Sequence, residues 1–160
     1  MTQAQPSAEK QIRDAQIVVG GLMTGLFTFT ILAAVLGPLG GERDPSLETN
    51  FFLLLAVAAP TSGLGYAILR NLMVREVRGR ATELQQKSNP VEEILPAYRK
   101  FVISGGGLIE GPGLFAGVAY LVSGHPGFLA AALLAPALLL AHFPTMERAR
   151  RLTQRATEPA

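Results

Sequence analysis

Four apolar runs, each long enough to cross a lipid bilayer, constrain the fold of this 160-residue chain more than any other feature. They cover residues 17–39, 51–69, 101–122 and 126–143, which is 18 to 23 residues each. At a rise of about 1.5 Å per residue, helices of this length match a hydrocarbon core of about 30 Å. Helices of a soluble bundle would each carry a polar face, and these runs lack the charges to make one. The sequence therefore predicts an all-α fold, an integral membrane four-helix bundle over residues 17–143.

The Lys and Arg residues predict how the chain is oriented. Thirteen of the 14 lie before the first run, between the second and third runs, or after the fourth, and only Arg43 lies elsewhere. The positive-inside rule therefore places residues 1–16, the loop 70–100 and the basic tail 144–160 in the cytoplasm, with both termini. Basic residues beside apolar runs favour contact with the lipid bilayer and its anionic headgroups over nucleic acid. A cleaved signal peptide is the alternative interpretation of the first run, which exceeds the usual apolar core of about 7 to 15 residues.

Two sets of internal matches indicate that the chain is duplicated. At an offset of 86, Gly20 to Gly25 align with Gly106 to Gly111, and at an offset of 76, Phe52 aligns with Phe128 and Pro60 with Pro136. The simplest interpretation is two tandem helical hairpins that both enter the membrane from the cytoplasm, so that equivalent helices are parallel. Chance is the alternative, because glycine and leucine are common in membrane spans.

Small residues predict which helix faces pack. Five glycines recur at helical spacing on the first and third runs: Gly21, Gly25, Gly107, Gly113 and Gly117. Glycines spaced in this way let two membrane helices approach closely. We therefore expect the first and third runs to cross through these faces.

Glu110 lies near the middle of the third run, where an ionisable group is expensive. The ten Phe, Val, Ile and Leu residues of this run contribute roughly −3 to −6 kcal/mol to insertion, and an ionised carboxylate costs about 2.5 to 3.5 kcal/mol. No Lys or Arg in any run can pair with it. We therefore expect Glu110 to point into the bundle, to be protonated or in contact with water, and to bind a hydroxyl group. The candidate partners are Thr24, Thr28, Ser62 and Tyr66.

The cytoplasmic loop between the second and third runs is predicted to be helical. Apolar residues from Met73 to Leu84 recur at helical spacing, so the second run should continue as an amphipathic helix. Asn89 fits the cap of a short helix that begins at Pro90 and ends by Pro96. This segment could bind a partner or lipid, or could simply connect the spans.

The sequence offers little for catalysis or metal binding. It has no cysteine, and its two histidines, His125 and His142, lie at opposite ends of the fourth run, too far apart to share a metal. It also lacks a glycine-rich phosphate loop, paired carboxylates at one depth, and a nucleophile with a plausible base. We therefore expect no catalytic residue, no metal and no cofactor, and hence no enzyme.

The segment from Gly107 to Gly111, with Glu110 among glycines in a duplicated hairpin, resembles the proteolipid ring subunits of rotary ATP synthases and vacuolar ATPases. The resemblance implies an intramembrane acid that carries a proton or a sodium ion. In that family the acid is on the second helix of a hairpin and the termini face away from the cytoplasm, whereas Glu110 is on a first helix. More broadly, Arg99, the glycine-rich helix and Phe115 are similar to small bacterial membrane proteins of unassigned function, which implies the bacterial cytoplasmic (inner) membrane.

We expect a non-catalytic accessory or assembly component of the membrane, as a homo-oligomer or with a partner in a membrane complex. The alternative is a subunit of a proton- or ion-linked transporter or channel that uses Glu110. The structural role requires only a packed hydrogen-bond partner for the carboxyl. Transport requires a water path to Glu110 and a second polar cluster.

Overall fold

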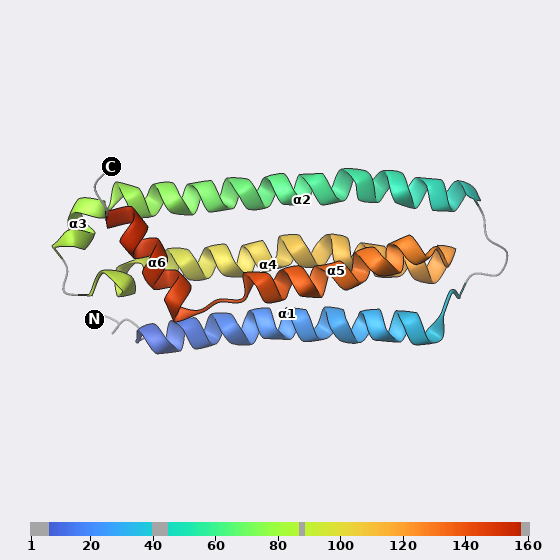
Figure 1. The fold of residues 1–160 in the computed structure, drawn as a ribbon, viewed down its shortest axis with the longest axis horizontal. Coiled ribbons are helices and arrows are strands. Elements are labelled where there is room, and N and C mark those ends of the chain that lie inside the picture. Colours follow the sequence, from blue (N-terminus) through green and yellow to red (C-terminus); the bar gives the residue numbers. More distant parts are fainter. Residues whose placement is uncertain (1–6, 40–44, 87–88, 158–160) are drawn as a thin grey trace, which may run out of the picture.

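The computed structural model describes residues 7–39, 45–86 and 89–157, and this part of the chain is almost entirely helical (Figure 1). Six helices follow one another: α1 (Ala8–Leu36), α2 (Pro45–Gly79), α3 (Ala81–Gln85), α4 (Pro90–Ser123), α5 (Pro126–His142) and α6 (Met146–Thr157). The all-α prediction is confirmed for the described residues. Arg43 and the first six residues of the predicted N-terminal segment lie outside them.

Helix α4 is the centre of the bundle. It packs against α1, α2 and α5, and α1 also packs against α5. In the described chain α1 and α2 are not among the packed helix pairs, and Figure 1 shows them along opposite edges. The first of the two predicted hairpins is therefore not a packed unit, because α4 lies between its helices. Helices α4 and α5 do form a packed hairpin.

Helices α1 and α4 run in the same direction through the bundle. Along their contact, Leu22 approaches Gly106, Leu26 approaches Gly113 and Phe29 approaches Gly117. The residue numbers rise together on both helices, so the two helices are parallel. This is the relation that the offset of 86 residues predicts for duplicated hairpins.

Three helices are long and apolar enough to span a membrane: α1 with 29 residues, α2 with 35 and α4 with 34. Helix α5 has 17 residues, which is about 26 Å of helix. It passes the same test only together with α6, from which it is bent by 64°. The described chain therefore has three such helices, or four if the bent pair forms one span. These apolar helices indicate a membrane protein.

Helix α4 is longer than predicted at its N-terminal end. Pro90 occupies its first turn, where a missing N–H costs no helical hydrogen bond. The predicted helix end at Pro96 is wrong, since α4 continues through it into the third apolar run. Burial explains this continuity: Leu95 and Tyr98 are only 1% and 3% exposed, and ending the helix at Pro96 would separate them from the face on which they pack.

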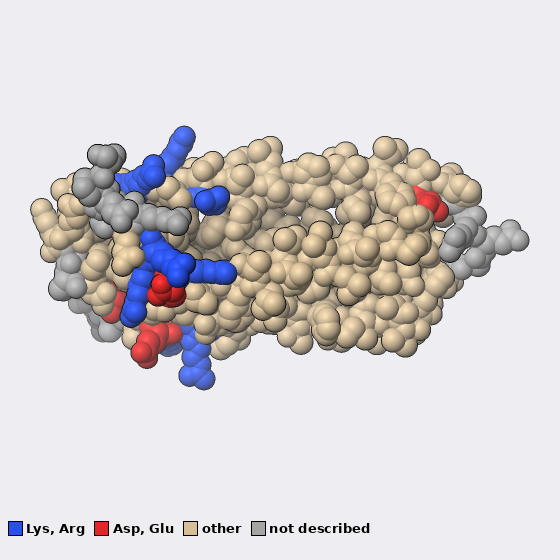
Figure 2. Space-filling model, viewed as in Figure 1, with Lys and Arg blue, Asp and Glu red and all other residues tan. Residues whose placement is uncertain are grey.

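The largest apolar cluster lies at one end of the bundle, formed by the start of α1, the end of α2, α3, the start of α4 and α6. We call this the basic end, because the Lys and Arg side chains visible in Figure 2 gather there. The cluster comprises Ile12, Val19, Met73, Val77, Leu84, Ile94, Leu95, Tyr98, Val102 and Ala149. Helix α6 contributes Ala149 to it, whereas the sequence predicts only a basic tail over residues 144–160.

Solvent explains why the cluster lies at this end. Water drives apolar side chains together outside a bilayer, whereas lipid tails are as apolar as the side chains themselves. Accordingly, the apolar window of α2 has no buried residue, but Met73 and Val77 beyond it are 5% and 4% exposed. The apolar stripe of the predicted cytoplasmic loop is therefore used within the chain.

Candidate functional site

The predicted polar site around Glu110 is not assembled. Glu110 is partly exposed on α4, and it has no hydrogen bond or ion pair to any residue in the described part of the chain. Thr24 and Thr28 are exposed, because they lie on the side of α1 opposite the buried Leu26. Helix α1 turns Leu22 and Leu26, and not Thr24 or Thr28, toward α4.

The predicted packing glycines fall into two groups. A Cβ atom added at Gly21, Gly25 or Gly107 would meet nothing within 4 Å. One added at Gly113 would overlap the Cβ atom of Ala135 on α5, and one added at Gly117 would overlap the Phe29 ring. The contact between α1 and α4 therefore differs from the prediction, because bulky side chains of α1 fill the space left by the glycines of α4.

Ser62 and Tyr66 lie in a groove of about 460 Å³ between α2, α4 and α5. Most of its lining is apolar, including Leu108 on α4 and Leu138 on α5. His142, the last residue of α5, also lines the groove. The structure thus brings Ser62 and Tyr66 together, whereas Glu110 and the two threonines are not among the lining residues.

Tyr66, His142 and the carbonyl of Val102 form a hydrogen-bonded series across three helices. The Tyr66 hydroxyl is 3.0 Å from Nδ1 of His142, and Nε2 of His142 is 3.1 Å from the Val102 oxygen. A carbonyl oxygen only accepts, so Nε2 carries the proton and donates it. Nδ1 of the neutral ring then accepts from the Tyr66 hydroxyl. The series sets the tautomer of His142, which is 8% exposed, and satisfies both ring nitrogens.

Gly105 makes room for this arrangement. A Cβ atom at that position would lie 2.9 Å from Nε2 of His142 and 3.1 Å from the Tyr66 ring. Phe101 packs against both rings, with centroid distances of 5.5 Å to Tyr66 and 5.4 Å to His142. These contacts join α2, α4 and α5 at one depth.

A second cavity of about 240 Å³ is lined by Tyr66 and His142 together with Arg148 and Arg151 of α6. Arg148 is held in place because its Nη1 donates to the carbonyls of Ala141, at 2.7 Å, and Phe143, at 2.9 Å. The last carbonyls of a helix have no partner within it, and a positive charge there is favourable. Arg148 therefore caps α5 and faces the cavity.

Tyr98 lines the same cavity from α4, at the basic end and before the third apolar run. Burial raises the pKa of its hydroxyl, and the backbone N–H of Thr145 and the charge of Arg148 oppose this shift. The hydroxyl is therefore neutral at physiological pH.

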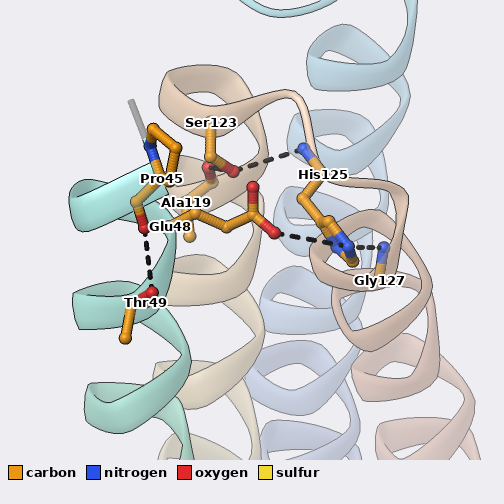
Figure 3. A network of polar contacts seen from close by, with 7 residues as sticks. All are labelled: Pro45, Glu48, Thr49, Ala119, Ser123, His125 and Gly127. Atoms are coloured by element: carbon orange, nitrogen blue, oxygen red, sulfur yellow. Dashed lines mark hydrogen bonds and ion pairs between the residues drawn. The ribbon is translucent and has the colours of Figure 1, made fainter. Parts of the chain in front are cut away.

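His125 links helices at the opposite end of the bundle (Figure 3). Its Nδ1 accepts the backbone N–H of Gly127 at 3.1 Å, at the start of α5. In the neutral ring the proton is therefore on Nε2, which lies 3.5 Å from Oε1 of Glu48 on α2. The Phe52 ring also packs on His125, with centroids 5.0 Å apart. The two histidines thus join α2 to the α4–α5 hairpin, one at each end.

Two contacts were not predicted from the sequence: that of Tyr66 with His142, and that of Arg148 with the end of α5. A signal for the first pair was present, because Tyr66 and His142 are 76 positions apart, the same offset as Phe52 and Phe128. The Phe52 and Phe128 rings also contact each other, at 4.3 Å between centroids. Duplicated parallel helices place equivalent residues at the same depth, so the offset could have been used to pair side chains.

The polar groups described above mostly bind one another or the ends of helices. The open spaces that remain are the apolar groove of about 460 Å³ and, at one end of it, the cavity lined by Arg148 and Arg151, which we call the basic cavity. Among the described residues, no group of three His, Asp or Glu side chains could hold a metal ion. Comparison with family models, with curated proteins and with solved structures finds no match to this chain.

Proposed function

We propose that the protein is a non-catalytic accessory or assembly component of a membrane, which acts by associating with another membrane-embedded chain. The partner is a second copy or a different subunit. The observation that carries this proposal is Glu110, a partly exposed carboxyl in an apolar run with no hydrogen bond or ion pair in the described chain. An ionised carboxylate at such a depth costs about 2.5 to 3.5 kcal/mol, and a donor on a second chain would offset that cost.

The surface beside Glu110 suits a close helix contact. Gly107 and Gly111 flank it, and a Cβ atom added at either position would meet nothing within 4 Å. A helix of another chain could therefore approach the α4 backbone there. Elsewhere in the bundle Tyr66, His142 and Arg148 are engaged in contacts that hold helices together, which supports a structural and not a catalytic role.

Single cysteines in this cysteine-free chain test the association. Gly107→Cys and Gly111→Cys should crosslink to a neighbouring chain in native membranes. Val57→Cys is the matched control, because Val57 is 67% exposed on α2. Glu110→Gln should preserve the crosslinks, since an amide keeps the hydrogen-bonding capacity of a neutral carboxyl, whereas Glu110→Leu should weaken them. Equal crosslinking at all three positions would refute the association, and unchanged crosslinking with Glu110→Leu would refute the role of the carboxyl in it.

A subunit of a proton- or ion-linked transporter or channel is the second candidate. The same observation favours it, because a carboxyl that no described side chain binds is available to load a proton or cation. Flux into proteoliposomes separates the two functions. In a transporter both Glu110→Gln and Glu110→Leu should abolish flux while the fold is kept. Flux that survives Glu110→Gln would exclude this carboxyl as the carrier.

We propose that the basic end faces the cytoplasm and that the chain lies in the bacterial cytoplasmic membrane. The support for this orientation is the positive-inside rule, applied to the Lys and Arg side chains that gather beside α3 and α6 (Figure 2). The start of α1 and the end of α6 both lie at this end (Figure 1), so the proposed orientation places the N-terminal segment and the basic tail in the cytoplasm.

A further inference from the structure

The apolar groove and the basic cavity adjoin each other. Tyr66, Ala141 and His142 line both of them. On one side of these residues the walls are apolar side chains of α2, α4 and α5, and on the other side are Arg148 and Arg151. A ligand that fills both must therefore have an apolar part and an anionic part.

The dimensions of the groove fit a lipid chain. Its lining on α2 extends from Leu55 to Tyr66. Eleven steps of about 1.5 Å give roughly 16 Å, which is close to half of a hydrocarbon core of about 30 Å. One leaflet of the bilayer supplies hydrocarbon of this length, and the groove ends at Tyr66 and His142, on the side of the basic end.

The groove is also open to the bilayer. Helices α2 and α5 meet at the Phe52 and Phe128 rings and again at Tyr66 and His142, and the groove opens between these two contacts. In Figure 2 the surface is hollowed along this line, below the upper edge formed by α2. Leu134 and Leu138, on the α5 side of the groove, are 58% and 48% exposed. A lipid can therefore enter sideways from its own leaflet.

The basic cavity offers donors for a phosphate group. The two bonds from Nη1 of Arg148 use two of the five N–H donors of a guanidinium and hold its plane beside the cavity. Arg151 forms an exposed ion pair with Glu147, 3.0 Å from Nε to Oε1. Two guanidinium groups against this one carboxylate leave a net positive charge, and the fork of an arginine suits phosphate oxygens.

We propose that the groove between α2, α4 and α5 binds one acyl chain of an anionic phospholipid, with the lipid phosphate in the cavity beside Arg148 and Arg151. In this arrangement the lipid hydrocarbon lies against leucines, and the lipid phosphate lies against arginines. Glu110 is not among the residues that line either cavity. The site is therefore independent of the association proposed above.

Tryptophan fluorescence can test the acyl chain, because the natural chain has no tryptophan. A Leu138→Trp reporter lies in the groove, and Val57→Trp on the exposed face of α2 is its control. In phosphatidylcholine vesicles, a small fraction of phosphatidylglycerol with brominated chains should quench the groove reporter more than the control. Brominated phosphatidylcholine should quench both reporters alike. Equal quenching of both reporters by the anionic lipid would overturn the proposal.

Arginine variants test the phosphate. Arg151→Gln should lower the preference for the anionic lipid roughly tenfold, because it removes a hydrogen bond between two charged groups, the guanidinium and the phosphate. Arg148→Lys keeps the charge but loses the fork, so the preference should also fall. Arg150→Gln is the control, because Arg150 is exposed on the same helix and does not line the cavity. A loss of preference with Arg150→Gln equal to that with Arg151→Gln would show only general surface attraction, and would overturn the site.

Two further arms complete the test. Inorganic phosphate should leave the quenching by the anionic lipid unchanged when chloride of equal ionic strength serves as the reference. Selective loss of quenching in phosphate would identify an ion site without a lipid, against the proposal. Far-ultraviolet circular dichroism checks the fold of each variant, and Leu134→Trp replaces Leu138→Trp if that variant fails to fold.

Discussion

Gly113→Ala should destabilise the bundle because of what its added Cβ atom meets. That atom would overlap the Cβ atom of Ala135 and lie 3.2 Å from Cδ2 of Leu26. A leucine end can turn away, but a Cβ atom moves only with its backbone, so α4 and α5 must separate. Overpacking of this kind costs about 1 to 3 kcal/mol.

Gly111→Ala is the matched control on the same helix. Its Cβ atom would meet nothing within 4 Å. Both substitutions gain the same helix preference of alanine over glycine, about 0.5 to 1 kcal/mol, so this term cancels in the comparison. The difference in unfolding free energy between the two variants should therefore be about 1 to 3 kcal/mol, roughly a 5- to 150-fold difference in the folding equilibrium.

The measurement is a titration of each variant with sodium dodecyl sulfate in mild detergent, followed by circular dichroism. The double variant Gly113→Ala with Ala135→Gly should recover most of the loss, since it removes the opposing Cβ atom. A Gly113→Ala variant as stable as Gly111→Ala would show that α4 and α5 do not pack through this position.

Three further predictions follow from other parts of the structure. Tyr66→Phe leaves Nδ1 of the buried His142 without its donor and should cost about 1 to 3 kcal/mol in the same titration. Tyr120→Phe is its control, and an equal effect of both would contradict the linking role of Tyr66. Because burial raises the pKa of Tyr98, its neutral form should stabilise the fold fully below the unfolded pKa of about 10, and this contribution should be lost as the pH rises through the folded value. The free energy of unfolding of Tyr98→Phe should then fall less steeply in alkali than that of the natural chain, and parallel curves would refute this. In whole cells a membrane-impermeant maleimide should label Ser46→Cys but neither Ser7→Cys nor Thr82→Cys. Labelling at position 7 would reverse the proposed orientation.

The helices themselves could be predicted from the sequence, because hydrocarbon requires backbone groups to pair within each segment. The runs at 51–69 and 101–122 lie within α2 and α4, and the run at 17–39 lies in α1 as far as Leu36, where that helix ends. The candidate site was harder to predict. Glu110 is recognisable as an unusual residue, but its surroundings could not be predicted. The glycine spacing favoured Thr24 and Thr28 as its partners, whereas the structure leaves both threonines exposed.

The amino-acid sequence is sufficient to predict long apolar helices with 13 of the 14 Lys and Arg residues on one side of them. It is the packing of distant segments that selects which faces of those helices meet, that Tyr66 binds His142, and that Arg148 caps α5. The physical reason is that the apolar stripe of a helix in water identifies the face that packs against its neighbours. A helix in lipid is apolar all round, so its sequence does not identify that face. Its rotation then depends on contacts between distant segments, such as Leu26 against Gly113, that no local pattern encodes.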